Sequence, residues 1–69
     1  MHPFDRVLAA FPAEPVESLE AIRQQLPDMD MNRIERIVQR ARVAGFIRST
    51  DEGHCITALG TSYLQRRLG

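Results

Sequence analysis

Residues 18–49 read SLEAIRQQLPDMDMNRIERIVQRARVAGFIRS, and this stretch decides the fold that the sequence predicts. It contains two segments in which apolar residues recur at helical spacing, separated by a short turn. We expect the first helix of the pair over residues 19–26, with Ser18 as its cap and Pro27 at its end. Its buried stripe consists of Leu19, Ile22 and Leu26.

The second segment predicts a helix over residues 31–44, between the turn PDMD and Gly45. Asp30, or Asp28, is placed to accept hydrogen bonds from the free amides at the start of this helix. Gly45 suits the left-handed conformation that commonly follows a helix. At about 100° per residue, one side of the helix is apolar and should be buried. That side consists of Ile34, Ile37, Val38 and Ala41.

The chain before this pair predicts one more helix and an extended link. Pro3 is acceptable in the first turn of a helix, and Pro12 and Pro15 then break the chain so that PAEPV stays extended. The apolar stripe of this helix is Phe4, Val7, Leu8 and Phe11.

The chain after Gly45 predicts a β-hairpin and a last helix. FIRST and HCIT have the composition of strands, and we expect a three-residue loop, DEG, in which Gly53 supplies a positive φ. Thr57 is suited to cap the final helix. Its apolar residues are Leu59, Tyr63, Leu64 and Leu68.

Length and composition indicate one small domain over residues 1–69. The chain is 43% apolar, as is ordinary for globular proteins, and its single cysteine excludes an internal disulfide. No apolar run is long enough to span a membrane, and MHPFDRV lacks the apolar core of a signal peptide. We therefore expect a cytoplasmic protein without a membrane partner.

A net charge of zero conceals a strong asymmetry along the chain. Residues 1–32 hold two arginines against six acidic residues, whereas residues 33–69 hold seven arginines against three. Such a division indicates a charged partner or complementary packing between the halves. All nine basic residues are arginine, whose planar fork suits phosphates, guanine and carboxylates.

The chain resembles winged helix-turn-helix domains, which are found in many bacterial and phage transcription regulators. Residues 18–49 and the segment ITALGTSYLQRRL (residues 56–68) carry the resemblance, which covers nearly the whole chain. It implies a mainly α fold with a small β-hairpin, in which a three-helix core is followed by a wing and a C-terminal helix. No motif in it is diagnostic of one subfamily.

The resemblance implies that the helix over residues 31–44 enters the major groove of double-stranded DNA. Opposite its apolar side lie arginine, asparagine and glutamine, which pair with the edges of guanine and adenine. Ser49 and Thr50 would touch the DNA backbone from the start of the wing. The predicted DNA-binding residues are therefore Asn32, Arg33, Arg36, Gln39, Arg40, Ser49 and Thr50. Because one such unit buries little surface on DNA, we expect a homodimer.

A competing interpretation is that these arginines form an ordinary solvated face, because arginine and glutamine are good helix formers. In that case Arg33 pairs with Asp30, and Glu17 or Glu20 meets other arginines.

Acidic residues oppose DNA binding: Asp51 and Glu52 occupy the predicted wing tip, and Asp28 and Asp30 lie near the start of the helix. The alternative function is a non-catalytic adaptor or inhibitor, bacterial or phage, that binds a protein partner. A structural subunit of a larger assembly is a third possibility.

We expect no enzyme, no cofactor and no metal. His54 and Cys55 are adjacent on a predicted strand and point to opposite faces, so they form neither a metal site nor a catalytic pair. The four glycines are scattered rather than gathered in a phosphate-binding loop. Cys55, Phe4, Phe11, Phe46 and Tyr63 are expected in the core.

Overall fold

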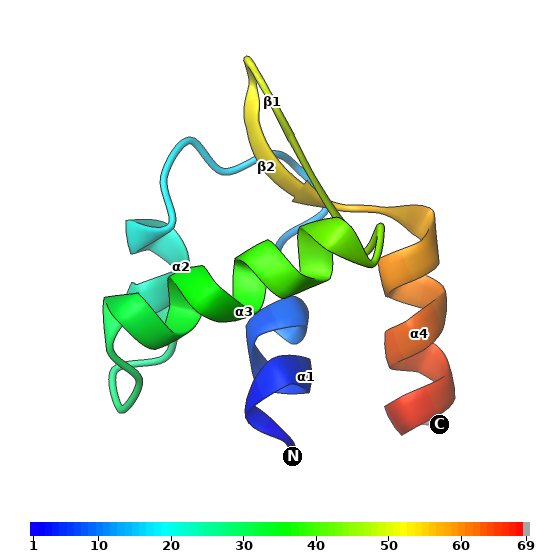
Figure 1. The fold of residues 1–69 in the computed structure, drawn as a ribbon, viewed down its shortest axis with the longest axis horizontal. Helices are drawn as coiled ribbons and strands as arrows, with labels where there is room; N and C mark the ends of the chain where they lie inside the picture. Colours follow the sequence, from blue (N-terminus) through cyan, green and yellow to red (C-terminus); the bar gives the residue numbers. More distant parts are fainter. Residues whose placement is uncertain (69) are drawn as a thin grey trace.

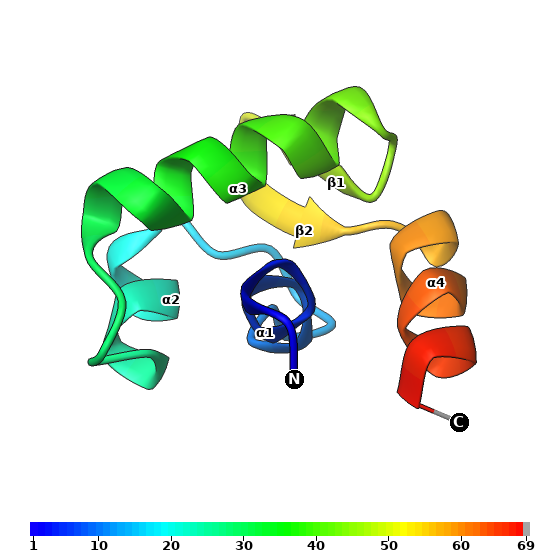
Figure 2. The same cartoon turned by 60° about the horizontal axis from the view of Figure 1, so that its bottom comes forward.

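The computed structural model describes residues 1–68, which form four helices and one two-stranded antiparallel sheet. In chain order, the elements are α1 (Pro3–Ala9), α2 (Glu20–Gln25), α3 (Met31–Val43), β1 (Ile47–Thr50), β2 (Gly53–Ile56) and α4 (Ala58–Leu68). In Figure 1, α3 crosses the middle of the molecule, with the hairpin above it and α1 below. Figure 2 shows α1 nearly end-on, beneath α3 and between α2 and α4. The prediction of a mainly helical fold with a small β-hairpin is confirmed.

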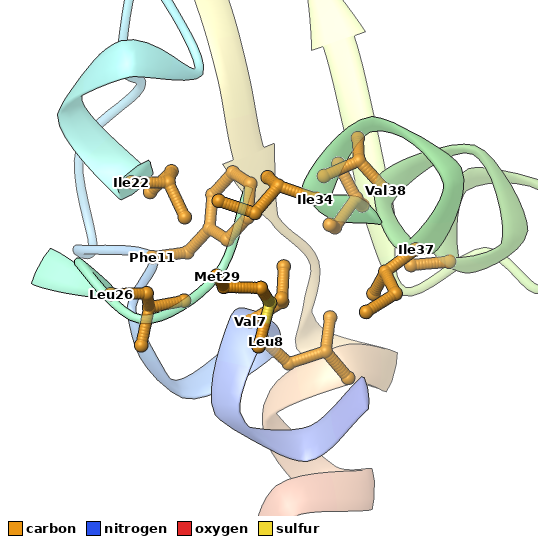
Figure 3. Packing of buried hydrophobic residues seen from close by; sticks show 11 residues of the cluster. Val7, Leu8, Phe11, Ile22, Leu26, Met29, Ile34, Ile37 and Val38 are labelled. Carbon is orange, nitrogen blue, oxygen red and sulfur yellow. The ribbon is translucent and has the colours of Figure 1, made fainter. Parts of the chain in front are cut away.

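The core lies between α3 and the two preceding helices. All four predicted side chains of α3 are buried, and Figure 3 shows Ile37 directed toward Leu8 of α1 and Ile34 beside Phe11. Val7 and Leu8 of α1 are fully buried there. Burial of an aliphatic side chain of this size stabilises the folded state by about 1.5–3 kcal/mol. The buried hydrophobic residues are Val7, Leu8, Phe11, Ile22, Leu26, Met29, Ile34, Ile37, Val38, Ala41 and Ile47.

The ends of α3 are fixed by the residues that its sequence predicts. Asp30, and not Asp28, is the N-cap, because its Oδ1 accepts a hydrogen bond of 2.8 Å from the Arg33 amide. Gly45 follows the helix with φ +85°, a conformation that side chains with a Cβ rarely adopt. Helix α3 ends at Val43, one residue earlier than predicted.

The first two helices are shorter than their apolar stripes. Helix α1 ends at Ala9, so Phe11 reaches the core from the turn that follows it. Helix α2 begins at Glu20 rather than at residue 19 and ends at Gln25. Leu19, and not Ser18, occupies the N-cap position, but Ser18 still satisfies a free amide, because its Oγ accepts a hydrogen bond of 3.0 Å from the Glu20 backbone amide.

The hairpin has a tighter turn than predicted. Thr50 pairs with Gly53, so Asp51 and Glu52 alone form the turn, and the expected three-residue loop is wrong. Gly53 has φ +125°, and a Cβ at this position would lie 2.3 Å from the carbonyl oxygen of Val16. A glycine is therefore required both by the backbone conformation and by the closely packed link before α2.

The extended link between α1 and α2 lies beside the hairpin as a third extended segment. Val16 and His54 form an antiparallel bridge, in which each amide donates to the other residue's carbonyl at 2.9 and 2.8 Å. Pro12 and Pro15, which precede Val16, discourage helix in the link and favour the extended backbone that pairing needs. The bridge ties the acidic first part of the chain to the hairpin.

Helix α4 packs on the core through half of its predicted stripe, Tyr63 and Leu64, together with Gly60. The Thr57 hydroxyl accepts from the Gly60 amide at 3.1 Å and donates to the Gly45 carbonyl at 2.6 Å, which confirms it as the cap. Gly60 is buried, and a Cβ there would lie 2.5 Å from the Phe46 carbonyl oxygen. Leu59 and Leu68 are 51% and 55% exposed, so the predicted stripe is wrong at these two positions.

Candidate nucleic-acid interface

Helix α3 exposes the five predicted DNA-binding residues that it carries: Asn32, Arg33, Arg36, Gln39 and Arg40. They lie opposite or beside the buried side of the helix. Val43, at the far end of the same face, is 81% exposed. The burial of the two isoleucines on one side thus directs the arginines on the other toward solvent.

The carboxylates that precede α3 in the chain are engaged elsewhere. Arg6 donates two hydrogen bonds of 2.8 Å to the two oxygens of Asp28, and Glu20 pairs with Arg23 of its own helix. The expected pairing of Arg33 with Asp30 takes another form, since the Asp30 carboxylate accepts from the Arg33 backbone amide rather than from its guanidinium.

The four α3 arginines therefore remain without an ion pair among residues 1–68. Arg42 donates a long hydrogen bond of 3.4 Å to Oε1 of Gln39, on the flank away from Arg33 and Arg40. Like charges at the spacing of Arg36 and Arg40 repel by a few tenths of a kcal/mol. The free protein thus keeps a mildly unfavourable row of positive charge on this helix.

An open groove of about 460 Å³ runs between the start of α1 and the arginine flank of α3. We call it the α1–α3 groove. No carboxylate lines it within the described part of the chain. Its lining residues are His2, Pro3, Phe4, Arg33, Arg36, Ile37 and Arg40. The sequence reasoning missed the part of α1 in this groove, because no local pattern reveals which segment will lie beside α3.

The two predicted site residues of the hairpin lie on β1 and make contacts within the hairpin. Ser49 is half-buried, and its Oγ lies 2.6 Å from Nδ1 of His54 on the opposite strand. Thr50 is exposed, and its hydroxyl accepts from the Glu52 amide at 3.2 Å. The adjoining turn exposes two carboxylates, those of Asp51 and Glu52.

A buried carboxylate, which the sequence reasoning did not single out, joins α1 to α4. Asp5 is 3% exposed and accepts hydrogen bonds from the Tyr63 hydroxyl at 2.8 Å and from Arg67 Nε at 3.3 Å. Burial favours the protonated acid, but these bonds and the charge of Arg67 outweigh it, so the pKa of Asp5 lies below its ordinary value. The bond to Asp5, together with burial, raises the pKa of Tyr63.

The other side chains that could bind a metal or act in catalysis do not form a common site in the described residues. Within residues 1–68, no three side chains of His, Cys, Asp or Glu gather in a way that would hold a metal ion. Cys55 is a half-buried free thiol, and His54 contacts Ser49. None of the helices in this part of the chain combines the length and the apolar character needed to cross a membrane.

Comparisons of the chain with protein-family models, curated proteins and solved structures found no match. Its function is therefore inferred from the geometry and charge of the α3 face.

Proposed function

We propose that this chain is a small DNA-binding protein of the winged helix-turn-helix type, a transcriptional regulator that reads the major groove with α3. The observation that carries the proposal is the row formed by Arg33, Arg36 and Arg40 on α3, which are exposed and have no carboxylate partner within residues 1–68. A row of unneutralised guanidinium groups on one helix favours a polyanionic partner.

The shape and side chains of α3 suit the major groove. Its 13 residues extend roughly 20 Å at 1.5 Å per residue, and the major groove of B-DNA, about 12 Å wide, admits an α-helix. Arginine pairs with guanine, and asparagine and glutamine pair with adenine, through two hydrogen bonds each. Asn32 and Gln39 occupy the outer part of the helix and are assigned to bases. The row of Arg33, Arg36 and Arg40 is assigned to phosphates or bases, and Ser49 and Thr50 are assigned to the DNA backbone.

The order of the elements also supports the proposal. Three helices, of which the last two are joined by a short turn, are followed by a hairpin and a final helix, as the resemblance implies. The hairpin follows the carboxyl end of α3, the position at which the resemblance leads us to expect a wing (Figure 1). The final helix returns to pack on α1 through Tyr63.

The acidic turn of the hairpin limits how much the wing contributes. Asp51 and Glu52 repel phosphate, and the whole chain has no net charge. Binding would therefore depend on α3, and two copies on adjacent half-sites would supply the contact area that one unit lacks. We accordingly propose a cytoplasmic homodimer.

Chromatography on heparin and on random duplex DNA tests the proposal. The wild type should elute late, with a slope of log K against log salt of roughly −3.6 for about four neutralised phosphates. The double variant Arg36→Ala/Arg40→Ala should elute early. Arg42→Ala/Arg66→Ala removes the same charge from two other exposed positions and should elute close to the wild type.

A protein-binding adaptor or inhibitor is the second candidate. The apolar floor of the α1–α3 groove and the exposed Val43 favour it, because both offer apolar surface to a partner's side chains. If the wild type and the Arg36→Ala/Arg40→Ala variant both pass through the DNA column at low salt, DNA binding is excluded and this candidate replaces it.

A further inference from the structure

We propose that the α1–α3 groove holds consecutive phosphates of one DNA strand, which leaves Asn32 and Gln39 to face the bases. This inference rests on the proposed DNA binding. It specifies in addition which side of α3 contacts the DNA backbone. It also assigns His2, at the start of α1, to the interface.

The polar groups that line the groove are hydrogen-bond donors. Arg33, Arg36 and Arg40 donate only, since a guanidinium has no acceptor. Nδ1 of His2 accepts a hydrogen bond of 3.2 Å from the Phe4 amide, so a neutral imidazole carries its proton on Nε2 and donates there as well. Phosphate oxygens accept without donating, and they complement a lining of this kind.

The floor of the groove is apolar and held in place. Phe4 packs edge-on against Phe46 and Tyr63, with ring centroids 6.2 and 5.9 Å away, and Ile37 is 7% exposed. Such a floor supports the aliphatic stems of the arginines and lowers the local dielectric, which strengthens their attraction to a phosphate.

The spacing of the arginines suits a nucleic-acid strand. Arg33 and Arg40 are seven residues apart, or roughly 10 Å along α3 at 1.5 Å per residue. One DNA strand presents a phosphate about every 3.4 Å of helix axis, so this row can meet two or three of them. A single carboxylate or a free phosphate would engage only part of the row.

The opposite flank of α3 is less suited to phosphate. Glu35 is exposed there and repels a polyanion, and Arg42 donates to Gln39. Asn32, Glu35 and Arg36 line a shallow hollow on that side, in which a single arginine lies beside a carboxylate and an amide. The difference in charge between the two flanks of α3 therefore indicates that the DNA backbone lies in the α1–α3 groove.

Binding to a random-sequence duplex, measured by fluorescence anisotropy at several salt concentrations, tests this assignment. The double variant Arg33→Gln/Arg40→Gln should lower the magnitude of the salt slope by about 1.8, because each lost phosphate contact removes about 0.9. The charge-matched Arg42→Gln/Arg66→Gln should change it by less than about 0.5. Asn32→Ala/Gln39→Ala should leave the slope unchanged, since neither residue is charged.

The outcomes separate this inference from the proposed function. A wild type that does not bind the duplex at low salt overturns both. A wild type that binds, with the two arginine pairs lowering the slope equally, overturns only the groove assignment and indicates a uniform cationic surface. A hexaglutamate peptide that displaces the duplex at matched charge concentration also overturns it, because the groove then prefers carboxylates. Thermal melting of each variant by circular dichroism checks that it is folded.

Discussion

The hydroxyl of Tyr63 donates a hydrogen bond of 2.8 Å to Oδ1 of Asp5, across a separation of 58 residues. This bond and the one from Arg67 Nε to Oδ2 are the polar part of the contact between α4 and α1. Phe4 of α1 packs edge-on against Tyr63, with ring centroids 5.9 Å apart, and is its apolar part, while Phe46 stacks on the same tyrosine at 4.7 Å. Helix α4 is therefore held by one buried carboxylate and one aromatic cluster, and each can be changed separately.

Replacing Tyr63 by phenylalanine removes the hydrogen bond and keeps the ring. Because Asp5 is buried, the loss of a donor should lower the free energy of unfolding by about 1–3 kcal/mol. Urea unfolding at neutral pH, followed by circular dichroism, measures the difference. A change below about 0.5 kcal/mol, the scale of an ordinary surface substitution, would mean that solvent or Arg67 replaces the lost donor.

The ion pair between Arg6 and Asp28 predicts an acid-sensitive contribution to stability. The hydrogen bonds from Arg6, and after them a backbone hydrogen bond at Asp28, lower the pKa of Asp28 from 3.8 to about 2, with smaller effects from the charges of Arg6 and Arg33. Since the folded-state pKa is depressed, the contribution is present above pH 3.8 and is lost as the pH falls toward 2. NMR titration of the Asp28 carboxyl should show the low value in the wild type and a return toward 3.8 in Arg6→Gln. An unchanged value in the variant would contradict the assigned cause.

Gly53→Ala tests the close approach of the link to the hairpin. The new Cβ would meet the Val16 carbonyl, and the positive φ adds strain of about 1–3 kcal/mol. Gly45→Ala is the control, because it has a positive φ but its Cβ would lie 3.4 Å from a flexible atom of Leu59. Thermal melting should show a larger loss for Gly53→Ala. Equal losses would indicate that backbone strain alone decides both positions.

Ile34→Ala and Val43→Ala compare the two sides of α3. Ile34 is fully buried, so its truncation should cost about 2–5 kcal/mol of unfolding free energy. Val43 is on the exposed face, and its truncation should change stability by less than about 0.5 kcal/mol. Both are measured by denaturant unfolding. Similar losses at the two positions would disagree with the orientation of the helix and with the outward direction of its arginines.

Neutralising the hairpin turn should strengthen DNA binding. The double variant Asp51→Asn/Glu52→Gln keeps the size of both side chains and removes two charges that repel phosphate. Its affinity for a random duplex should rise several-fold at low salt, and the gain should shrink as salt is raised. Anisotropy at two salt concentrations measures it. An unchanged affinity would place the turn away from the DNA backbone.

Local patterns predicted the parts of this structure that depend on neighbouring residues. The apolar side of α3 follows from helical periodicity, the role of Asp30 from capping chemistry, and the end of the helix from Gly45. The same periodicity places the arginines on the solvent side, so the exposed α3 face was predictable. Its use for DNA binding stays a prediction.

Contacts between distant segments were not predictable in this way. The Val16–His54 bridge, the Asp5–Tyr63 bond and the α1 wall of the groove each join residues far apart in sequence. The packing side of α4 was misjudged at Leu59, because Gly60, the residue that allows close approach, has no apolar side chain to signal burial.

The bridge between Val16 and His54 has a consequence for how the hairpin opens. A two-stranded hairpin alone is marginally stable in water, and its backbone amides would exchange with solvent through local fraying. The reciprocal bonds to the link instead bind the hairpin to the chain that leads into α2. Hydrogen–deuterium exchange at the backbone amides of Val16 and His54 should therefore require opening of the molecule as a whole.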